Sequence, residues 1–139
     1  MISDIRVFLC DDDHLRFFGE GPCRLLHLIE ETGSLRAAAM SMGMAYTKAL
    51  AIMRRAEKNL GFPLTARRIG GKGGGGSVLT PKAKEFLHDY ETYRDACIQS
   101  SRELYTQIFS KYADGGEDNH AFFFEDCFDA LRNGIVIFY

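Results

Sequence analysis

The chain has 139 residues, of which 46% are hydrophobic and 26% charged, enough for the core of about one ordinary soluble domain. No apolar run approaches the ~20 residues that a membrane helix needs, and the N-terminal Met1–Asp4 lacks the basic and apolar regions of a signal peptide. No membrane partner is therefore expected. The four cysteines, Cys10, Cys23, Cys97 and Cys127, form no CxxC pair, which indicates free thiols in a reducing cytoplasm.

The formal net charge of −2 hides a strong segregation of charge along the chain. Between Ser34 and Lys84 the only acid is Glu57, so this segment has a formal charge of +9 and the rest of the chain −11. The ten basic residues of the segment are Arg36, Lys48, Arg54, Arg55, Lys58, Arg67, Arg68, Lys72, Lys82 and Lys84. A localised basic face is what neutralisation of a nucleic-acid backbone needs.

The N-terminal residues predict a hairpin. Residues 5–9 alternate apolar with charged and are typical of a half-buried strand, and Leu15–Phe18 suit a returning strand. Between them, Asp11–His14 offers three acids and a histidine as possible metal ligands. A solvated turn is the favoured interpretation, because no second ligand cluster accompanies it.

A first helix is predicted from Pro22, which suits a first helical turn, to about Thr32, with Gly33 ending it. Its apolar residues are Leu25, Leu26, Leu28 and Ile29. We interpret His27, within this apolar run, as a packed or partly exposed helix histidine. A catalytic role is disfavoured, because no motif places a serine, cysteine or acid beside it.

The next residues predict a helix-turn-helix. Ser34 can cap a short helix that runs to Met42, Gly43 permits a tight turn, and a second helix runs from residue 45 or 46 to about Leu60. Small side chains flank the turn and allow a close crossing of the two helices, namely Ala38, Ala39 and Ala49. In this motif the second helix enters the major groove of DNA.

Helical spacing divides the second helix into two faces. The core-facing positions are predicted to be Ala49, Ile52, Met53, Ala56 and Leu60. Because residues at the start of such a helix reach base edges, Tyr46, Thr47 and Lys48 are the specificity candidates. Arg55 and Lys58 are predicted to contact phosphates. The other predicted DNA contacts are Ser34, Arg36, Ala51, Arg67, Arg68 and Lys72, and the alternative is an ordinary solvated basic face.

A basic hairpin follows. The helix is predicted to end at residues 61–63, because of the proline. A strand is predicted over 64–69, with Arg67 and Arg68, and a short return strand over 77–79. The tip between them, 70–76, is rich in glycine and contains Lys72. A nucleotide-binding loop is disfavoured, because this loop precedes a strand and no serine or threonine follows Lys72. The order predicts an α+β winged helix-turn-helix, with the wing on the flanking backbone or minor groove.

These motifs together resemble the DNA-binding domain of molybdate-responsive ModE-type transcriptional regulators and, more weakly, LysR-type regulators. The resemblance covers about residues 5–90. Its most specific part is the run 70–75 before Leu79-Thr-Pro81. The segments that carry it are 33–34, 37–39, 42–46, 63–64, 67–68, 70–75 and 79–81. The family usually has serine where this chain has Ala45, and arginine and tryptophan near Thr47, Lys48 and Leu50, so the resemblance implies a poorer helix cap and a different DNA sequence. The family's oxyanion-binding domains would follow the long helix, where too few residues remain to hold them.

A long helix is predicted from Pro81 to about Ala113, roughly 50 Å at 1.5 Å per residue, with Thr80 as its cap. Its apolar stripe is too long for one small domain to cover, which predicts pairing with a second copy of the chain. The predicted dimer-interface residues are Phe86, Tyr90, Tyr93, Cys97, Leu104, Ile108 and Tyr112. An aromatic tail, 114–139, is expected to pack on this helix or on the partner chain.

The sequence therefore predicts a winged-helix domain over 1–80, a dimerisation helix over 81–113 and a C-terminal tail. The predicted function is a homodimeric transcriptional regulator that binds an inverted repeat in double-stranded DNA. No cofactor, metal or catalysis is expected. Two alternatives are a protein-interaction module that has lost sequence-specific DNA binding, and an enzyme, for which no nucleophile–base or metal constellation is found.

Overall fold

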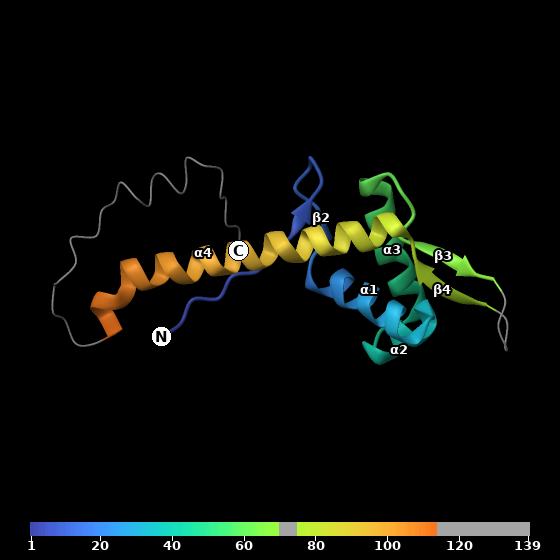
Figure 1. Cartoon of the computed structure of the whole chain (residues 1–139), viewed down its shortest axis with the longest axis horizontal. Helices are drawn as coiled ribbons and strands as arrows, with labels where there is room; N and C mark the ends of the chain where they lie inside the picture. The colour runs from blue at the N-terminus through green and yellow to red at the C-terminus, as the bar shows by residue number, and fades with distance from the viewer. Residues whose placement is uncertain (70–74, 114–139) are drawn as a thin grey trace. The chain divides into compact units, whose positions relative to one another are not determined.

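A computed structural model describes residues 1–69 and 75–113 of the chain, so the predicted tip around Lys72 and the predicted tail lie outside the described residues. Its elements are β1 (Leu9–Cys10), β2 (Arg16–Phe18), α1 (Glu20–Thr32), α2 (Leu35–Ser41), α3 (Tyr46–Leu60), β3 (Thr65–Arg68), β4 (Gly76–Leu79) and α4 (Pro81–Ala113) (Figure 1). The chain divides into two compact units. One unit is Phe8–Tyr90, so it extends ten residues beyond the domain end predicted at residue 80. The other unit holds Met1–Val7 and the part of α4 that begins at Glu91. The first unit has the predicted α+β winged helix-turn-helix fold.

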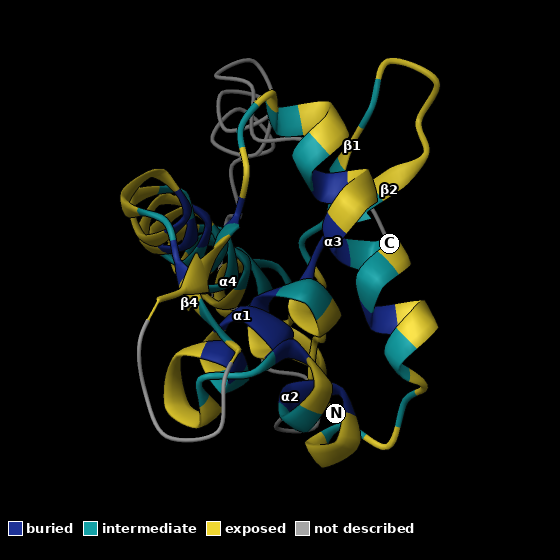
Figure 2. Ribbon diagram, turned by 90° about the vertical axis from the view of Figure 1, so that its right-hand side faces the viewer, coloured by how far each residue is buried: buried dark blue, intermediate teal, exposed yellow. Residues whose placement is uncertain are grey.

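Three helices build the core of the first unit, as Figure 2 shows by the buried residues on α1, α2 and α3. The α1 residues Leu25, Leu26 and Ile29 are fully buried. The small side chains that were expected at the helix crossing are buried too, namely Ala38 and Ala39 on α2 and Ala49 on α3. The prediction of a close crossing is confirmed by their burial, because only small residues let helix backbones approach in this way.

Local hydrogen bonds set the ends of these helices. Ser34 Oγ accepts a hydrogen bond from Ala37 N at 3.2 Å and so caps α2, as predicted. At the turn, Gly43 has a φ of 67°, and Met44 N donates to Ala39 O at 3.0 Å. Gly61 ends α3 with a φ of 80°. These positive φ values favour glycine, and they define the start and end of α3.

The wing is the antiparallel hairpin of β3 and β4, in which Thr65 pairs with Leu79 and Arg68 with Gly76. It is attached to the α1–α2 turn, because Ser77 N donates to Gly33 O at 2.8 Å. The approach is so close that a Cβ on Gly76 would lie 2.6 Å from the Gly33 oxygen. A glycine at position 76 is therefore required for the hairpin to dock.

Replacement of that glycine tests the docking. Gly76→Ala is expected to lower the free energy of unfolding by about 1–3 kcal/mol, because the new methyl group must push the wing away from Gly33. Thermal or denaturant unfolding measures the loss. Gly21→Ala is the matched control, since no atom lies within 4 Å of a Cβ at position 21 of α1. Equal unfolding free energies for the two variants would contradict the docking.

The N-terminal hairpin is shorter than predicted and shifted along the chain. The first strand is Leu9–Cys10 rather than 5–9, because only these residues pair with β2, and Met1–Val7 belong to the second unit. The predicted polar turn is confirmed, since Asp11 Oδ1 accepts hydrogen bonds from Asp13 N and Leu15 N, both at 2.9 Å. α1 begins at Glu20, two residues before the predicted start at Pro22. The helix tolerates the proline there, because the N–H groups of the first turn have no partner within the helix and proline has no N–H.

The first ten residues of α4 belong to the same compact unit as the winged domain, and Ala83, Leu87 and Tyr90 contribute to its core. Thr80 Oγ1 accepts a hydrogen bond from Ala83 N at 3.1 Å, which confirms the predicted cap. The Phe18 ring meets the rings of Phe86 and Tyr90 edge-on, with centroids 4.7 Å and 4.8 Å apart. Tyr90 is only 2% exposed. Phe86 and Tyr90, two of the predicted dimer-interface residues, thus pack against Phe18 of their own chain, and the more exposed aromatic side chains of α4 lie beyond them.

In the second unit, the Tyr105 hydroxyl donates to Met1 O at 2.6 Å, so the N-terminal segment lies against α4. The Tyr105 and Phe109 rings stack with centroids 5.4 Å apart. The α4 side chains Tyr93, Phe109 and Tyr112 are 48%, 40% and 63% exposed. Three other predicted interface residues, Cys97, Leu104 and Ile108, are half-buried. A hydrogen bond with the Cys97 side chain, the negative charge of its thiolate form and partial burial raise the pKa of Tyr93. Within the described residues, no helix has both the length and the apolar character of a bilayer span.

Candidate nucleic-acid interface

The start of α3 presents the three predicted specificity residues. Tyr46 is the first residue of the helix and is half-buried, whereas Thr47 and Lys48 are exposed. The N-cap residue, Ala45, makes no side-chain hydrogen bond. The first backbone N–H groups of α3 therefore rely on solvent or on a bound group for their hydrogen bonds. This is the poorer cap that the resemblance implied.

Arg36 joins α2 to the start of α3. Its guanidinium carbon lies 4.4 Å from the centroid of the Tyr46 ring, within the range of a cation–π contact. Arg36 is itself exposed, so the edges of the stacked guanidinium remain open to hydrogen-bond acceptors. Two predicted contacts from successive helices are thus brought together at one end of α3. The sequence carried no signal for this pairing, because it depends on the angle between two helices.

The exposed side of α3 is basic along its length. Lys48, Ala51, Arg55 and Lys58 are all exposed, and their spacing places them on one helical face. Arg54 is also exposed, although the sequence did not single it out as a DNA contact. In the part of the chain that the structure describes, Lys48, Arg54, Arg55 and Lys58 form no ion pair. Their charges are therefore not neutralised by any acid among the described residues.

The opposite face of α3 is apolar, as predicted. Ala49, Met53 and Ala56 are buried, and Ile52 and Leu60 are half-buried. Buried and exposed residues therefore alternate around the helix (Figure 2). The core holds one face of α3 in place while the basic face remains accessible.

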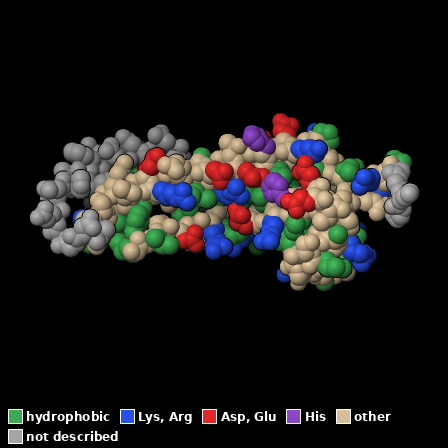
Figure 3. All heavy atoms as spheres, turned by 60° about the horizontal axis from the view of Figure 1, so that its bottom comes forward, with side chains coloured by type: hydrophobic (Ala, Val, Ile, Leu, Met, Phe, Trp, Pro, Cys, Tyr) green, Lys and Arg blue, Asp and Glu red, His purple; other side chains and the backbone are tan. Residues whose placement is uncertain are grey.

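The wing separates its two arginines. Arg67 and Arg68 are both exposed, and neighbouring residues of a strand point to opposite faces. Arg68 packs beside the α1–α2 turn, since a Cβ on Gly33 would lie 3.2 Å from its Nη1 atom. There its charge is next to the C-terminal end of α1, where a cation is favoured. Figure 3 shows Lys and Arg side chains near this hairpin, at the right-hand end of the view.

The remaining predicted contacts fall into two groups. Ser34 is half-buried, and its hydroxyl is engaged as the cap of α2. Lys72 lies outside the described residues. The structure therefore gives Ser34 a structural role, whereas the DNA contact of Lys72 stays a prediction.

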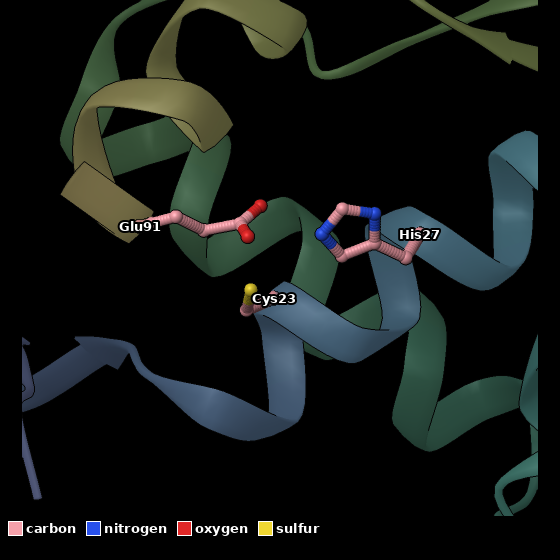
Figure 4. Close-up of side chains that lie close together, drawn as sticks. All are labelled: Cys23, His27 and Glu91. Carbon is pink, nitrogen blue, oxygen red and sulfur yellow. The ribbon is translucent and has the colours of Figure 1, made fainter. Parts of the chain in front are cut away.

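Cys23 and His27 lie one helical turn apart on α1 (Figure 4). Cys23 is buried and His27 is exposed, which agrees with a partly exposed helix histidine. One thiol and one imidazole on a single helix are fewer than the three or four protein ligands of a typical zinc site. This pair therefore does not by itself form a metal centre.

No family model matches the chain, but curated relatives match about half of it. The molybdenum transport protein ModE of Herbaspirillum seropedicae is 40% identical over 72 residues, or 52% of this chain. The N-terminal half of the chain resembles ModE. The molybdenum-pterin-binding protein MopB of Rhodobacter capsulatus is 38% identical over 66 residues, or 48% of the chain, and the transcriptional regulator ModE of Haemophilus influenzae 37% over 68 residues, or 49%. The predicted resemblance to ModE-type regulators is confirmed.

The chain covers only 25%, 24% and 27% of these three relatives, in the same order, or about a quarter of their length. Among solved structures, a LysR family transcriptional regulator aligns with 70% of this chain and 30% of its own. The TM-score is 0.48 and the sequence identity 18%, a loose similarity that adds nothing to the fold described above. The similarity to ModE therefore concerns the winged-helix half.

Proposed function

We propose that this protein is a homodimeric transcriptional regulator that binds double-stranded DNA and catalyses no reaction. The recognition helix, residues 45–60, enters the major groove, and the wing, residues 64–79, contacts the flanking backbone or minor groove. Lys48 and Thr47 contact base edges, while Arg55, Lys58 and Arg67 contact phosphates. The similarity of the N-terminal half to a transcriptional regulator named ModE supports this proposal.

One observation carries the proposal: the exposed face of α3 has cations along its whole length that make no ion pair within the described residues. Unneutralised cations on one helix repel one another, so a fold that gathers them gains from a polyanionic ligand. Duplex DNA supplies that ligand, since each phosphate contact releases bound counterions. The core packing of the other face holds the helix ready for docking.

The homodimer is proposed from the exposed aromatic side chains of α4. Tyr93, Phe109 and Tyr112 form part of an apolar stripe beyond Tyr90, and apolar patches of this kind usually mark an interface. Two copies that pair about a two-fold axis would present two recognition helices to an inverted repeat. The expected half-site spacing is about 34 Å or a multiple of it.

A protein-interaction module without sequence-specific DNA binding is the second candidate, favoured by the missing side-chain cap at Ala45. Binding of the full chain to random duplex DNA at several salt concentrations separates the two. A regulator gives a logarithmic affinity that falls steeply with the logarithm of salt concentration, by about 0.9 per phosphate contact. Absence of duplex binding at low salt would exclude the regulator. Selection from a genomic library then yields the operator.

Lys48→Ala tests specificity. The variant is expected to lose roughly 1–3 kcal/mol of binding free energy for the selected operator, because Lys48 lies exposed at the start of α3. Its affinity for non-specific duplex should fall less. Fluorescence anisotropy with an operator and a scrambled duplex of equal length measures both affinities.

Arg67→Ala is the matched control, because it also removes one exposed cation. It is expected to weaken both duplexes alike and to reduce the salt slope by about one. If Lys48→Ala gives the same pattern as Arg67→Ala, Lys48 contacts only phosphate.

A further inference from the structure

Glu57 is the one acid in the basic segment from Ser34 to Lys84, and it closes the connection from α3 to the wing. Its Oε2 atom accepts a hydrogen bond from Leu64 N at 2.8 Å. Its backbone oxygen accepts another from Gly61 N, also at 2.8 Å. Side chain and backbone of one residue thus hold both ends of the link between Gly61 and Leu64.

The hydrogen bonds continue from Leu64 to the far side of the wing. Thr80 N donates to Leu64 O at 3.0 Å, and Thr80 Oγ1 donates to Pro63 O at 2.7 Å. Leu64 is completely buried, so neither of its backbone groups is readily satisfied by water. Both are instead bonded, the N–H to α3 and the carbonyl to the residue that precedes α4. These two hydrogen bonds of Leu64 hold the chain at the point where it passes from α3 into β3.

The charge of Glu57 has no evident use in neutralising the basic face. Among the described residues, its carboxylate takes part in no ion pair, and it is half-buried rather than exposed. A carboxylate on a helix that meets phosphates opposes binding electrostatically. Its retained contact is a charge-assisted hydrogen bond to a backbone N–H, a strong type of hydrogen bond.

We infer that Glu57 is a positioning residue for DNA binding, which locks the wing to the recognition helix through Leu64 N. Helix and wing then reach the duplex as one rigid surface, and operator contacts need both in register. Non-specific binding needs only nearby cations, so it does not depend on this bond. The inference rests on the proposed function and assigns a residue that contacts no DNA.

Two variants separate positioning from charge. Glu57→Gln removes the charge but keeps an oxygen that can accept from Leu64 N, whereas Glu57→Ala removes both. Operator and scrambled duplex affinities are measured with the full chain, below the melting temperature of every variant. Both variants are expected to tighten binding to the scrambled duplex. The operator-to-scrambled ratio is expected to stay at the wild-type value for Glu57→Gln and to fall at least about tenfold for Glu57→Ala.

Glu57→Asp keeps the charge and shortens the side chain by one methylene, so it serves if Glu57→Ala folds poorly. The operator-to-scrambled affinity ratio of this variant should fall, while its affinity for scrambled duplex stays at the wild-type value. Glu85→Ala, which removes an exposed acid from α4, is the charge control and should leave the ratio unchanged. Equal ratios for the Ala, Asp and Gln variants, even with altered melting temperatures, would overturn the inference. A wild-type chain that binds no duplex would overturn the proposed function, and the inference with it.

Discussion

Leu104→Asp combined with Ile108→Asp is expected to separate the proposed dimer into monomers and to weaken operator binding by about 10²–10⁴-fold. Both side chains are half-buried on α4 beyond Tyr90, where the proposed pairing surface lies. Carboxylates placed in an apolar seam would lose their hydration without gaining partners, which costs several kcal/mol. A monomer offers one recognition helix instead of two, and the loss of the second contact accounts for the expected fall in affinity.

Sedimentation velocity measures the mass, and anisotropy with operator duplex measures the affinity. The control is Gln99→Asp combined with Thr106→Asp, which adds the same charge to exposed positions on the opposite side of the helix. Circular dichroism shows whether α4 remains helical in both proteins. A Leu104→Asp, Ile108→Asp protein that stays dimeric with intact operator affinity would place the contact elsewhere, for example on α1.

Phe18→Ala is expected to cause the largest loss of stability, about 3–5 kcal/mol of unfolding free energy. Phe18 is 1% exposed, and its ring packs edge-on against Phe86 and Tyr90 of α4. Each such aromatic pair adds about 0.5–1.5 kcal/mol beyond the area that it buries. The melting temperature should therefore fall by more than about 10 °C.

The neighbouring Phe17→Ala is the matched control, because it removes the same ring from a half-buried position of β2. Phe17→Ala should lower the free energy of unfolding clearly less than Phe18→Ala does. Calorimetry or denaturant unfolding of both variants decides the comparison. Equal costs would show that the contact between β2 and the start of α4 contributes little. Because Phe18 anchors that start, its loss should also weaken operator binding at temperatures where the variant is folded.

Local chemistry made most helix ends predictable from the sequence. Ser34 and Thr80 cap their helices through hydroxyls that lie within a few residues of the N–H groups they accept from. Gly43 and Gly61 mark turns by the positive φ that glycine favours. The predicted and observed bounds of α4 agree, and those of α3 agree within one residue. Such signals need no knowledge of the tertiary structure.

The remaining features depend on tertiary contacts, which sequence spacing does not encode. Periodicity places Phe86 and Tyr90 on the same stripe as Tyr93, but it does not say which protein surface covers each part. Phe18 covers the first two. The predicted strand at 5–9 differs from the observed Leu9–Cys10 for the same reason, because pairing with β2 decides where the strand lies. The stacking of Arg36 on Tyr46 needs two helices in their final positions.

The hydrogen bond from Ser77 N to Gly33 O has a consequence for solubility. A two-stranded hairpin has two open edges, and an open edge invites a strand from another molecule to add to it. On β4, the Ser77 N–H is already occupied by the α1–α2 turn, and Gly76 is in close contact with it. On β3, Arg67 and Arg68 place a positive charge on each face of the strand, which discourages pairing with a second copy of the same strand. We therefore expect the contact that docks the wing also to hinder the addition of a foreign strand at β4.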